Sequence, residues 1–191
     1  MKKFIYLIIV ISTLSCSNQE KNLPDNFDFG KTEAGSYVND FFEMEIFFNP
    51  DWVIQDKQQM NDLIDAGGEL FTGDDKNLKS AVEAAMVNTA YLLTIFKHEL
   101  GSAVEFNPSF MVIAENTKNA PGIKNGGDYL FHSKKLLEQT QMGYYFEKDV
   151  IEKTIGKSTF HVMEAKLDYM DMTIIQEYME LLHLSGHKVK S

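Results

Sequence analysis

Two alternating segments in the last third of the chain constrain the fold most strongly. Thr159–Tyr169 alternates, with His161 and then only apolar or aromatic side chains at every second position up to Tyr169, and Thr173–Leu182 is another strand-like run. Because successive side chains of a strand point to opposite faces, a period of two predicts a strand with one buried face. The turn residues Met170-Asp171 between the two runs predict a β-hairpin. An antiparallel pair of strands is therefore expected.

Three further segments also read as strands. Phe42–Phe48 alternates apolar residues with Glu43 and Glu45, which predicts a strand with one buried face. Tyr91–Phe96 and Phe110–Ala114 are apolar on both sides, as in central strands that are covered on both faces.

Helical spacing is clearest where apolar residues recur every three or four positions after Asp74 and Asp75, either of which can cap the helix. A shorter helix is expected to begin at a cap residue and to stop at a glycine pair, and another to follow a loop rich in Gly and Asn. The three predicted helices are Asp56 to Gly67-Gly68, Leu78–Thr89 and Asp128–Met142. This order of elements predicts an α+β domain at 36–191 with a largely antiparallel sheet flanked by helices.

The first sixteen residues have the pattern of an export signal. Lys2 and Lys3 precede an apolar stretch that is too short to span a bilayer, and small or polar residues then lead to Cys16. The pattern resembles a bacterial lipoprotein signal, which implies a signal peptide at 1–15, lipid attachment at Cys16 and a flexible tether at 16–35. Thr13 stands where the usual motif has Leu, so an uncleaved anchor or a secretory signal cut elsewhere stays open.

Composition narrows the possible partners. The chain of 191 residues has no arginine and a net charge of −10, which becomes about −12 once residues 1–15 are removed with their two lysines. An acidic field repels phosphate polyanions, and without arginine there is no bidentate guanidinium fork, so nucleic-acid binding is not expected. Lipidation of Cys16 would leave no thiol for a disulfide, a zinc ligand or a nucleophile.

His161 is the candidate for acid–base chemistry. A two-residue turn at Met170-Asp171 sets it opposite Glu180, whereas a slip of one residue replaces Glu180 with Met179. A His–carboxylate pair can tune a general base, but a hydrogen-bonded structural histidine is commoner. The sequence contains no named catalytic motif, so no catalytic residue is assigned.

The remaining candidates favour structural interpretations. His183 and His187 have helical metal-ligand spacing, but Gly186 interrupts them and no third ligand follows. The loop Pro121–Gly127 precedes a helix whose expected cap, Asp128, would repel an anion, so turn chemistry is favoured. We therefore predict no metal and no cofactor. The methionines of the hairpin are expected to fill the core, with an adaptable apolar surface as the alternative; they are Met163, Met170, Met172 and Met179.

A family resemblance accompanies these patterns. Tyr37-x-Asn39, the strand Phe42–Phe48 and Asn49-Pro50-Asp51-Trp52 resemble the opening of PsbP-like domains. The stretch that contains Ala114-Glu115-Asn116, Pro121-Gly122-Ile123 and Asp128-Tyr129-Leu130 is similar to the strand–loop–helix of related exported bacterial lipoproteins. The resemblance implies an α/β/α sandwich. Those domains usually finish with a further strand and helix, so here these elements are either absent or replaced by a divergent tail.

The functional expectation follows from the signal and from the lack of a catalytic motif. It is a lipoprotein held in the cell envelope through Cys16, facing the periplasm, that serves as a non-catalytic accessory or binding module. Ser17 after the cysteine resembles lipoproteins that have Ser rather than Asp at this position, and this resemblance implies the outer membrane over the inner one. Two alternatives remain: a carboxylate/His hydrolase that uses His161 with a nearby Glu, and a carrier of a small apolar ligand between helices and sheet.

Overall fold

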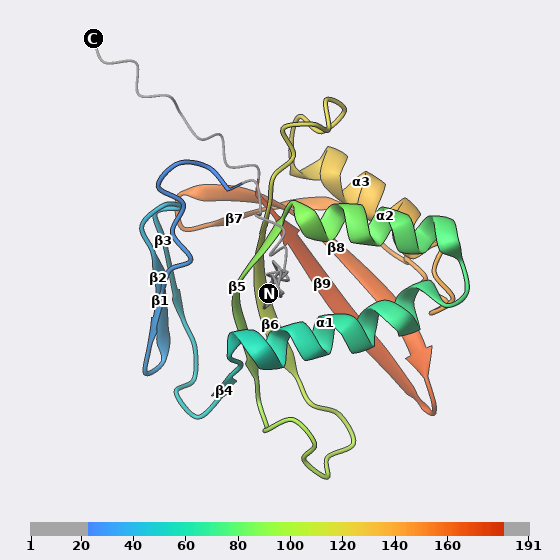
Figure 1. Cartoon of the computed structure of the whole chain (residues 1–191), viewed down its shortest axis with the longest axis horizontal. Helices are drawn as coiled ribbons and strands as arrows, with labels where there is room; N and C mark the ends of the chain where they lie inside the picture. The colour runs from blue at the N-terminus through green and yellow to red at the C-terminus, as the bar shows by residue number, and fades with distance from the viewer. Residues whose placement is uncertain (1–22, 182–191) are drawn as a thin grey trace, which may run out of the picture.

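The computed structural model describes residues 23–181, which form three helices and three small antiparallel sheets (Figure 1). The helices are α1 (Lys57–Thr72), α2 (Lys76–Val87) and α3 (Gly126–Leu137). Sheet A contains β1 (Lys31–Glu33), β2 (Ser36–Asn39) and β3 (Met44–Phe47); sheet B contains β4 (Val53–Ile54), β5 (Thr89–Phe96) and β6 (Ser109–Glu115); sheet C contains β7 (Ile151–Ile155), β8 (Ser158–Tyr169) and β9 (Met172–Glu180). The predicted α+β class is confirmed, and all strand pairs of the sheets are antiparallel.

The expected single sheet is replaced by three sheets of three strands each. Turns, helices and long loops join the sheets. Within each sheet, paired strands follow one another in the chain, and only the pair β4 and β5 has helices, α1 and α2, between its strands. The hairpin is as predicted. Tyr169 pairs with Met172, which leaves Met170-Asp171 as the two-residue turn, and Met170 has a positive φ of 52°.

The residue that caps α1 is predicted correctly, but the residue at which it ends is not. Asp56 accepts a hydrogen bond from the Gln59 backbone, and the Gln59 side chain accepts one from the Asp56 backbone, which makes a capping box. The helix then continues through Gly67-Gly68 to Thr72, and Gly73, which has a φ of 53°, caps its end. Phe71, beyond the glycine pair, packs against the core beneath α3, and this contact stabilises the last turn.

The capping residue of α2 is one of the two predicted residues, whereas that of α3 differs from the prediction. Asp75 accepts hydrogen bonds at the start of α2, as expected for one of the two predicted caps. Helix α3 begins at Gly126 rather than Asp128, because Asn125 caps it by accepting the Asp128 backbone N–H. The Asp128 carboxylate instead accepts the backbone N–H of Lys124. The helix ends at Leu137, short of the predicted Met142.

Strand burial follows the predicted pattern in β3 and β5 but differs in β6. Met44 and Ile46 face inward while Phe47 is 75% exposed, and β5 is covered on both faces. Strand β6 is the edge of sheet B, so it is not the central strand that its apolar run predicts. Met111 and Ile113, which pair with Thr94 and Tyr91 of β5, are nearly half exposed.

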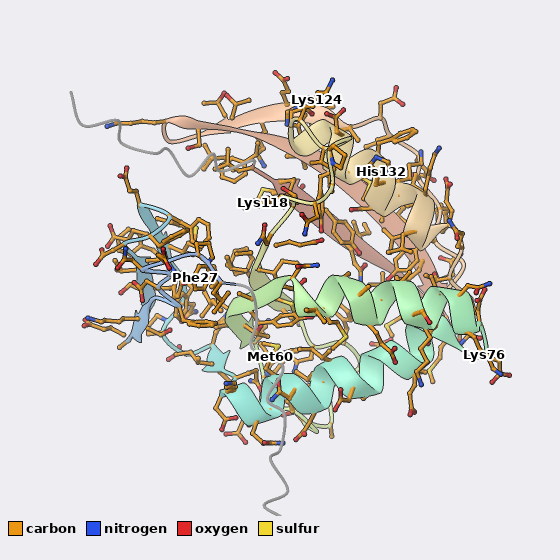
Figure 2. All side chains as sticks on the ribbon, turned by 45° about the horizontal axis from the view of Figure 1, so that its top comes forward. Phe27, Met60, Lys76, Lys118, Lys124 and His132 are labelled. Carbon is orange, nitrogen blue, oxygen red and sulfur yellow. The ribbon has the colours of Figure 1, made fainter. Side chains whose placement is uncertain are left out.

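The part of the predicted tether that the structure describes, residues 23–35, is folded. Within it, 31–33 form β1, and the Phe27 ring contacts the rings of Phe29, Phe41 and Phe42 (Figure 2). The buried Tyr37 hydroxyl donates to the Phe29 carbonyl at 2.8 Å. The folded domain thus starts before residue 36, while 16–22 lie outside the described residues.

Two apolar cores hold the elements together. Between sheets A and B, the core is centred on Tyr37, Leu93 and Ile95, and Trp52 packs against them. Between α3 and sheet C, the second core is centred on residues from both elements, which are Leu130, Leu137, Met163 and Ala165. On the remaining face of sheet B, α2 packs against β5 and Met60 of α1 contacts Thr94 (Figure 1). No helix within 23–181 combines the length and the hydrophobicity needed to cross a membrane.

Candidate functional site

His161 occupies the register position that the hairpin predicts. In sheet C it stands opposite Glu180 of β9 on one side and opposite Glu152 of β7 on the other. Its Nε2 atom lies 3.5 Å from a carboxylate oxygen of Glu152. The predicted register is therefore confirmed, and the neighbouring β7 supplies an additional carboxylate that sequence spacing did not identify.

Close packing against the start of α3 restricts the His161 ring. A Cβ atom added to Gly126 would lie 3.0 Å from its Nδ1 atom, and one added to Gly127 would lie 2.9 Å from its Cδ2 atom. The side chain is 22% exposed. The imidazole thus lies under the first turn of a helix, where its contacts are those of a packing residue.

Glu180, Glu115 and Tyr129 form a polar junction where sheet B, sheet C and α3 meet. The Tyr129 hydroxyl donates to the Glu115 carboxylate at 2.5 Å. Burial, with the nearby charge of Glu115, raises the pKa of Glu180 to about 7. Burial and the bond to Glu115 raise the pKa of Tyr129 well above its usual range. The junction therefore holds a carboxyl group that can exchange a proton near neutral pH.

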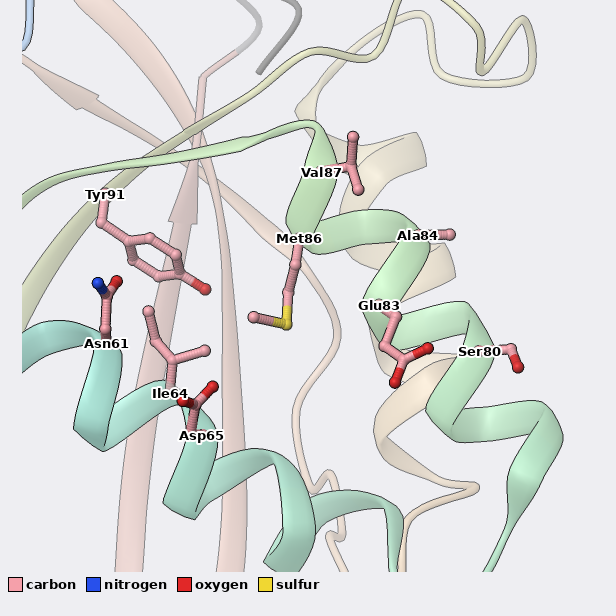
Figure 3. A pocket seen from close by; sticks show the side chains of 9 residues that line it. All are labelled: Asn61, Ile64, Asp65, Ser80, Glu83, Ala84, Met86, Val87 and Tyr91. Carbon is pink, nitrogen blue, oxygen red and sulfur yellow. The ribbon is translucent and has the colours of Figure 1, made fainter. Parts of the chain in front are cut away.

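A groove of about 700 Å³ lies between α1 and α2, over sheet B (Figure 3). Ile64 and Asp65 of α1 form one wall, Glu83 and Met86 of α2 form the other, and the Tyr91 ring from β5 reaches into the space between the helices. Its volume is within the range of small-molecule sites. The groove occupies the place between helices and sheet where the sequence suggests a ligand carrier, although polar side chains share its lining.

Tyr91 connects this groove to the polar junction. It pairs with Ile113 on β6, so Glu115, two residues further along, lies diagonal to it on the same face of the sheet. Burial and the charge of Glu115 raise the pKa of the Tyr91 hydroxyl. The inner end of the groove is thus a neutral phenol beside a carboxylate.

The other candidate residues are dispersed. Met163 is buried in the core, whereas Met170 is 81% exposed at the hairpin turn. Met172 lines a smaller hollow of about 470 Å³ beside Phe106. Cys16, His183 and His187 lie outside the described residues. Within 23–181, no three His, Cys, Asp or Glu side chains are placed to hold a metal ion.

Sequence patterns did not identify the residues that line the groove or form the junction. Glu115 and Tyr129 belong to segments with packing patterns, and Asp65 and Glu83 look like ordinary solvated helix positions. One signal was available: Glu115 ends a strongly apolar strand, which is an unusual place for a carboxylate. Comparison of the chain with protein-family models, with curated proteins and with solved structures finds no match.

Proposed function

We propose that this protein is a lipoprotein of the cell envelope, anchored through Cys16, whose α+β domain is a non-catalytic binding module. The groove between α1 and α2 is the observation that carries the binding role, because it combines the volume of a ligand site with a mixed apolar and polar lining. The anchor is supported by the signal pattern that ends at Cys16.

The surroundings of His161 favour binding over hydrolysis. A general base must reach the proton that it removes, but this imidazole packs against Gly126 and Gly127 and does not line the groove. A catalytic His also needs a nucleophile or an activated water in a cleft, whereas the partner of His161 in the structure is the exposed carboxylate of Glu152. These contacts are typical of a structural histidine.

The anchor is tested by metabolic labelling with an alkyne fatty acid in a bacterial host. We expect labelled wild-type protein in the membrane fraction and an unlabelled Cys16→Ala variant, because acyl transfer requires the thiol and each buried methylene contributes about 0.8 kcal/mol to membrane binding. Ser17→Ala, which keeps the thiol, is the matched control and should label as the wild type does. Equal labelling of the Cys16→Ala variant would refute lipidation at this residue.

A further inference from the structure

The groove between α1 and α2 carries negative charge on both walls. Asp65 projects from α1 and Glu83 from α2 (Figure 3), and neither forms an ion pair with another residue in the described part of the chain. No lysine lines the groove, and the chain has no arginine. The walls therefore favour a positively charged ligand and disfavour an anion.

Apolar side chains lie between these carboxylates. Ile64 faces the groove from α1, while Met86 faces it from the end of α2, where Val87 also belongs to the lining. A thioether side chain adapts its shape to different apolar partners. Together these side chains offer a surface for a hydrocarbon chain, which a small hydrated cation such as sodium would leave uncovered.

The inner end of the groove adds a polar group that suits the same ligand. The phenol oxygen of Tyr91 can accept a hydrogen bond from an ammonium group. Glu115 lies diagonal to Tyr91 on the same face of the sheet, so a further negative charge stands near this end of the groove.

We propose that the groove between α1 and α2 binds an organic cation with an apolar body, of which a protonated alkyl amine is the simplest example. The inference rests on the proposed binding function and specifies its ligand class. The ammonium group lies between Asp65 and Glu83, and the hydrocarbon chain lies on Ile64 and Met86. Such a ligand satisfies the unpaired carboxylates and covers the apolar surface at the same time.

Octylamine, octanol and octanoate test the proposal, because at pH 7 they share one chain length and differ in head-group charge. Isothermal titration of the full chain should show octylamine binding about tenfold more tightly than octanol, with octanoate weaker still. Added salt should weaken octylamine binding, since the carboxylates are exposed. Spermidine, a cation without an apolar body of this kind, should bind more weakly than octylamine.

Substitutions locate the site. Asp65→Asn and Glu83→Gln should each weaken octylamine binding about two- to fivefold, because an exposed ion pair contributes modestly. Met86→Ser should weaken both octylamine and octanol. Glu45→Gln, which makes the same charge change on the outward face of β3, is the matched control and should bind as the wild type does.

Different failures separate the two proposals. If octanol or octanoate binds as tightly as octylamine, or if Asp65→Asn with Glu83→Gln leaves octylamine affinity unchanged, the cation specificity is wrong while a binding module remains. If none of these ligands binds to the wild-type protein, the groove is not a ligand site, and both the ligand class and the binding role proposed for it are refuted.

Discussion

At the scale of single residues, the end of β9 combines a largely buried carboxyl group with a close approach of the α3 backbone. Glu180 is a carboxyl group held largely away from water, near the charge of Glu115. The backbone of α3 approaches it closely, since a Cβ atom on Gly126 would lie 2.6 Å from the Glu180 carbonyl oxygen. Any larger residue at 126 would have to move the strand or the helix, so the glycine is required by the close approach and not by a turn.

Glu180 should make the stability of the protein depend on pH. Its pKa is about 7 when folded and about 4.5 when unfolded, so the folded state retains a proton that the unfolded state releases. Stability should therefore fall as pH rises from about 4.5 to about 7 and level off above that range, with a total loss of ~3 kcal/mol for this shift. Urea unfolding at pH 4.5 and pH 8 measures the difference.

The matched variant is Glu180→Gln, which keeps the shape of the side chain and cannot ionise. It should exceed the wild type in stability at pH 8 and match it near pH 4.5. Glu177→Gln, on the exposed face of the same strand, is the control. Its free energy of unfolding should change between pH 4.5 and pH 8 by as much as that of the wild type. A Glu180→Gln protein whose stability changes with pH as steeply as that of the wild type would show that this carboxyl group is not responsible.

At the scale of elements, α1 shows how tertiary contacts overrule a local stop signal. The pair Gly67-Gly68 indicates a helix end, yet α1 continues to Thr72 and places Phe71 against the core beneath α3. Neither glycine has a positive φ, and a Cβ atom at either position would meet no other atom within 4 Å. Both glycines therefore weaken the helix without being required by it.

Alanine at these positions should stabilise the protein. Gly67→Ala and Gly68→Ala should each raise the free energy of unfolding by about 1 kcal/mol, because alanine loses less backbone entropy in a helix interior. Gly73→Ala is the contrasting control and should destabilise, since Gly73 has a φ of 53° and a Cβ atom there would lie 2.7 Å from the Gln141 side chain. Thermal or urea unfolding monitored by circular dichroism would distinguish these outcomes; a loss of stability in both helix variants would contradict the argument.

At the scale of the whole molecule, the segment before residue 31 completes the core between sheets A and B. The fully buried Tyr37 hydroxyl donates to the Phe29 carbonyl and accepts from the Asn39 side chain, which also donates to the Asp28 carbonyl at 2.9 Å. Without these acceptors, two buried polar side chains would lose hydrogen-bond partners.

Removal of the segment before Lys31 should therefore lower the stability of the protein. A chain that begins at Lys31 should be less stable than one that begins at Leu23 by about 3 kcal/mol or more, because each lost partner of a buried polar group costs about 1–3 kcal/mol and the Phe27 ring contacts are also lost. Denaturant midpoints of the two purified chains provide the measurement. Equal midpoints would mean that residues 23–30 add nothing to the stability of the fold, in agreement with the tether at 16–35 that the sequence alone suggests.

Local pattern was sufficient for several parts of this protein. Alternation predicts β3 and the hairpin with its register from His161 to Glu180, and side-chain chemistry predicts the cap Asp56 and, as one of two candidates, the cap Asp75. These features depend on neighbours in the chain or on a two-residue turn, whose geometry fixes strand register. The signal pattern at 1–16 is likewise readable from sequence, and its function stays a prediction.

Only the tertiary structure decided the rest, because long-range contacts set it. The split into three sheets, the edge position of β6 and the continuation of α1 depend on which elements pack together. The same holds for both sites: Asp65 and Glu83 line one groove from two different helices, and the charge of Glu115 acts on Glu180 where two sheets and α3 converge. Such pairings join residues that are distant in sequence, and at Glu180 burial then raises the pKa of the carboxyl group, which no local pattern predicts.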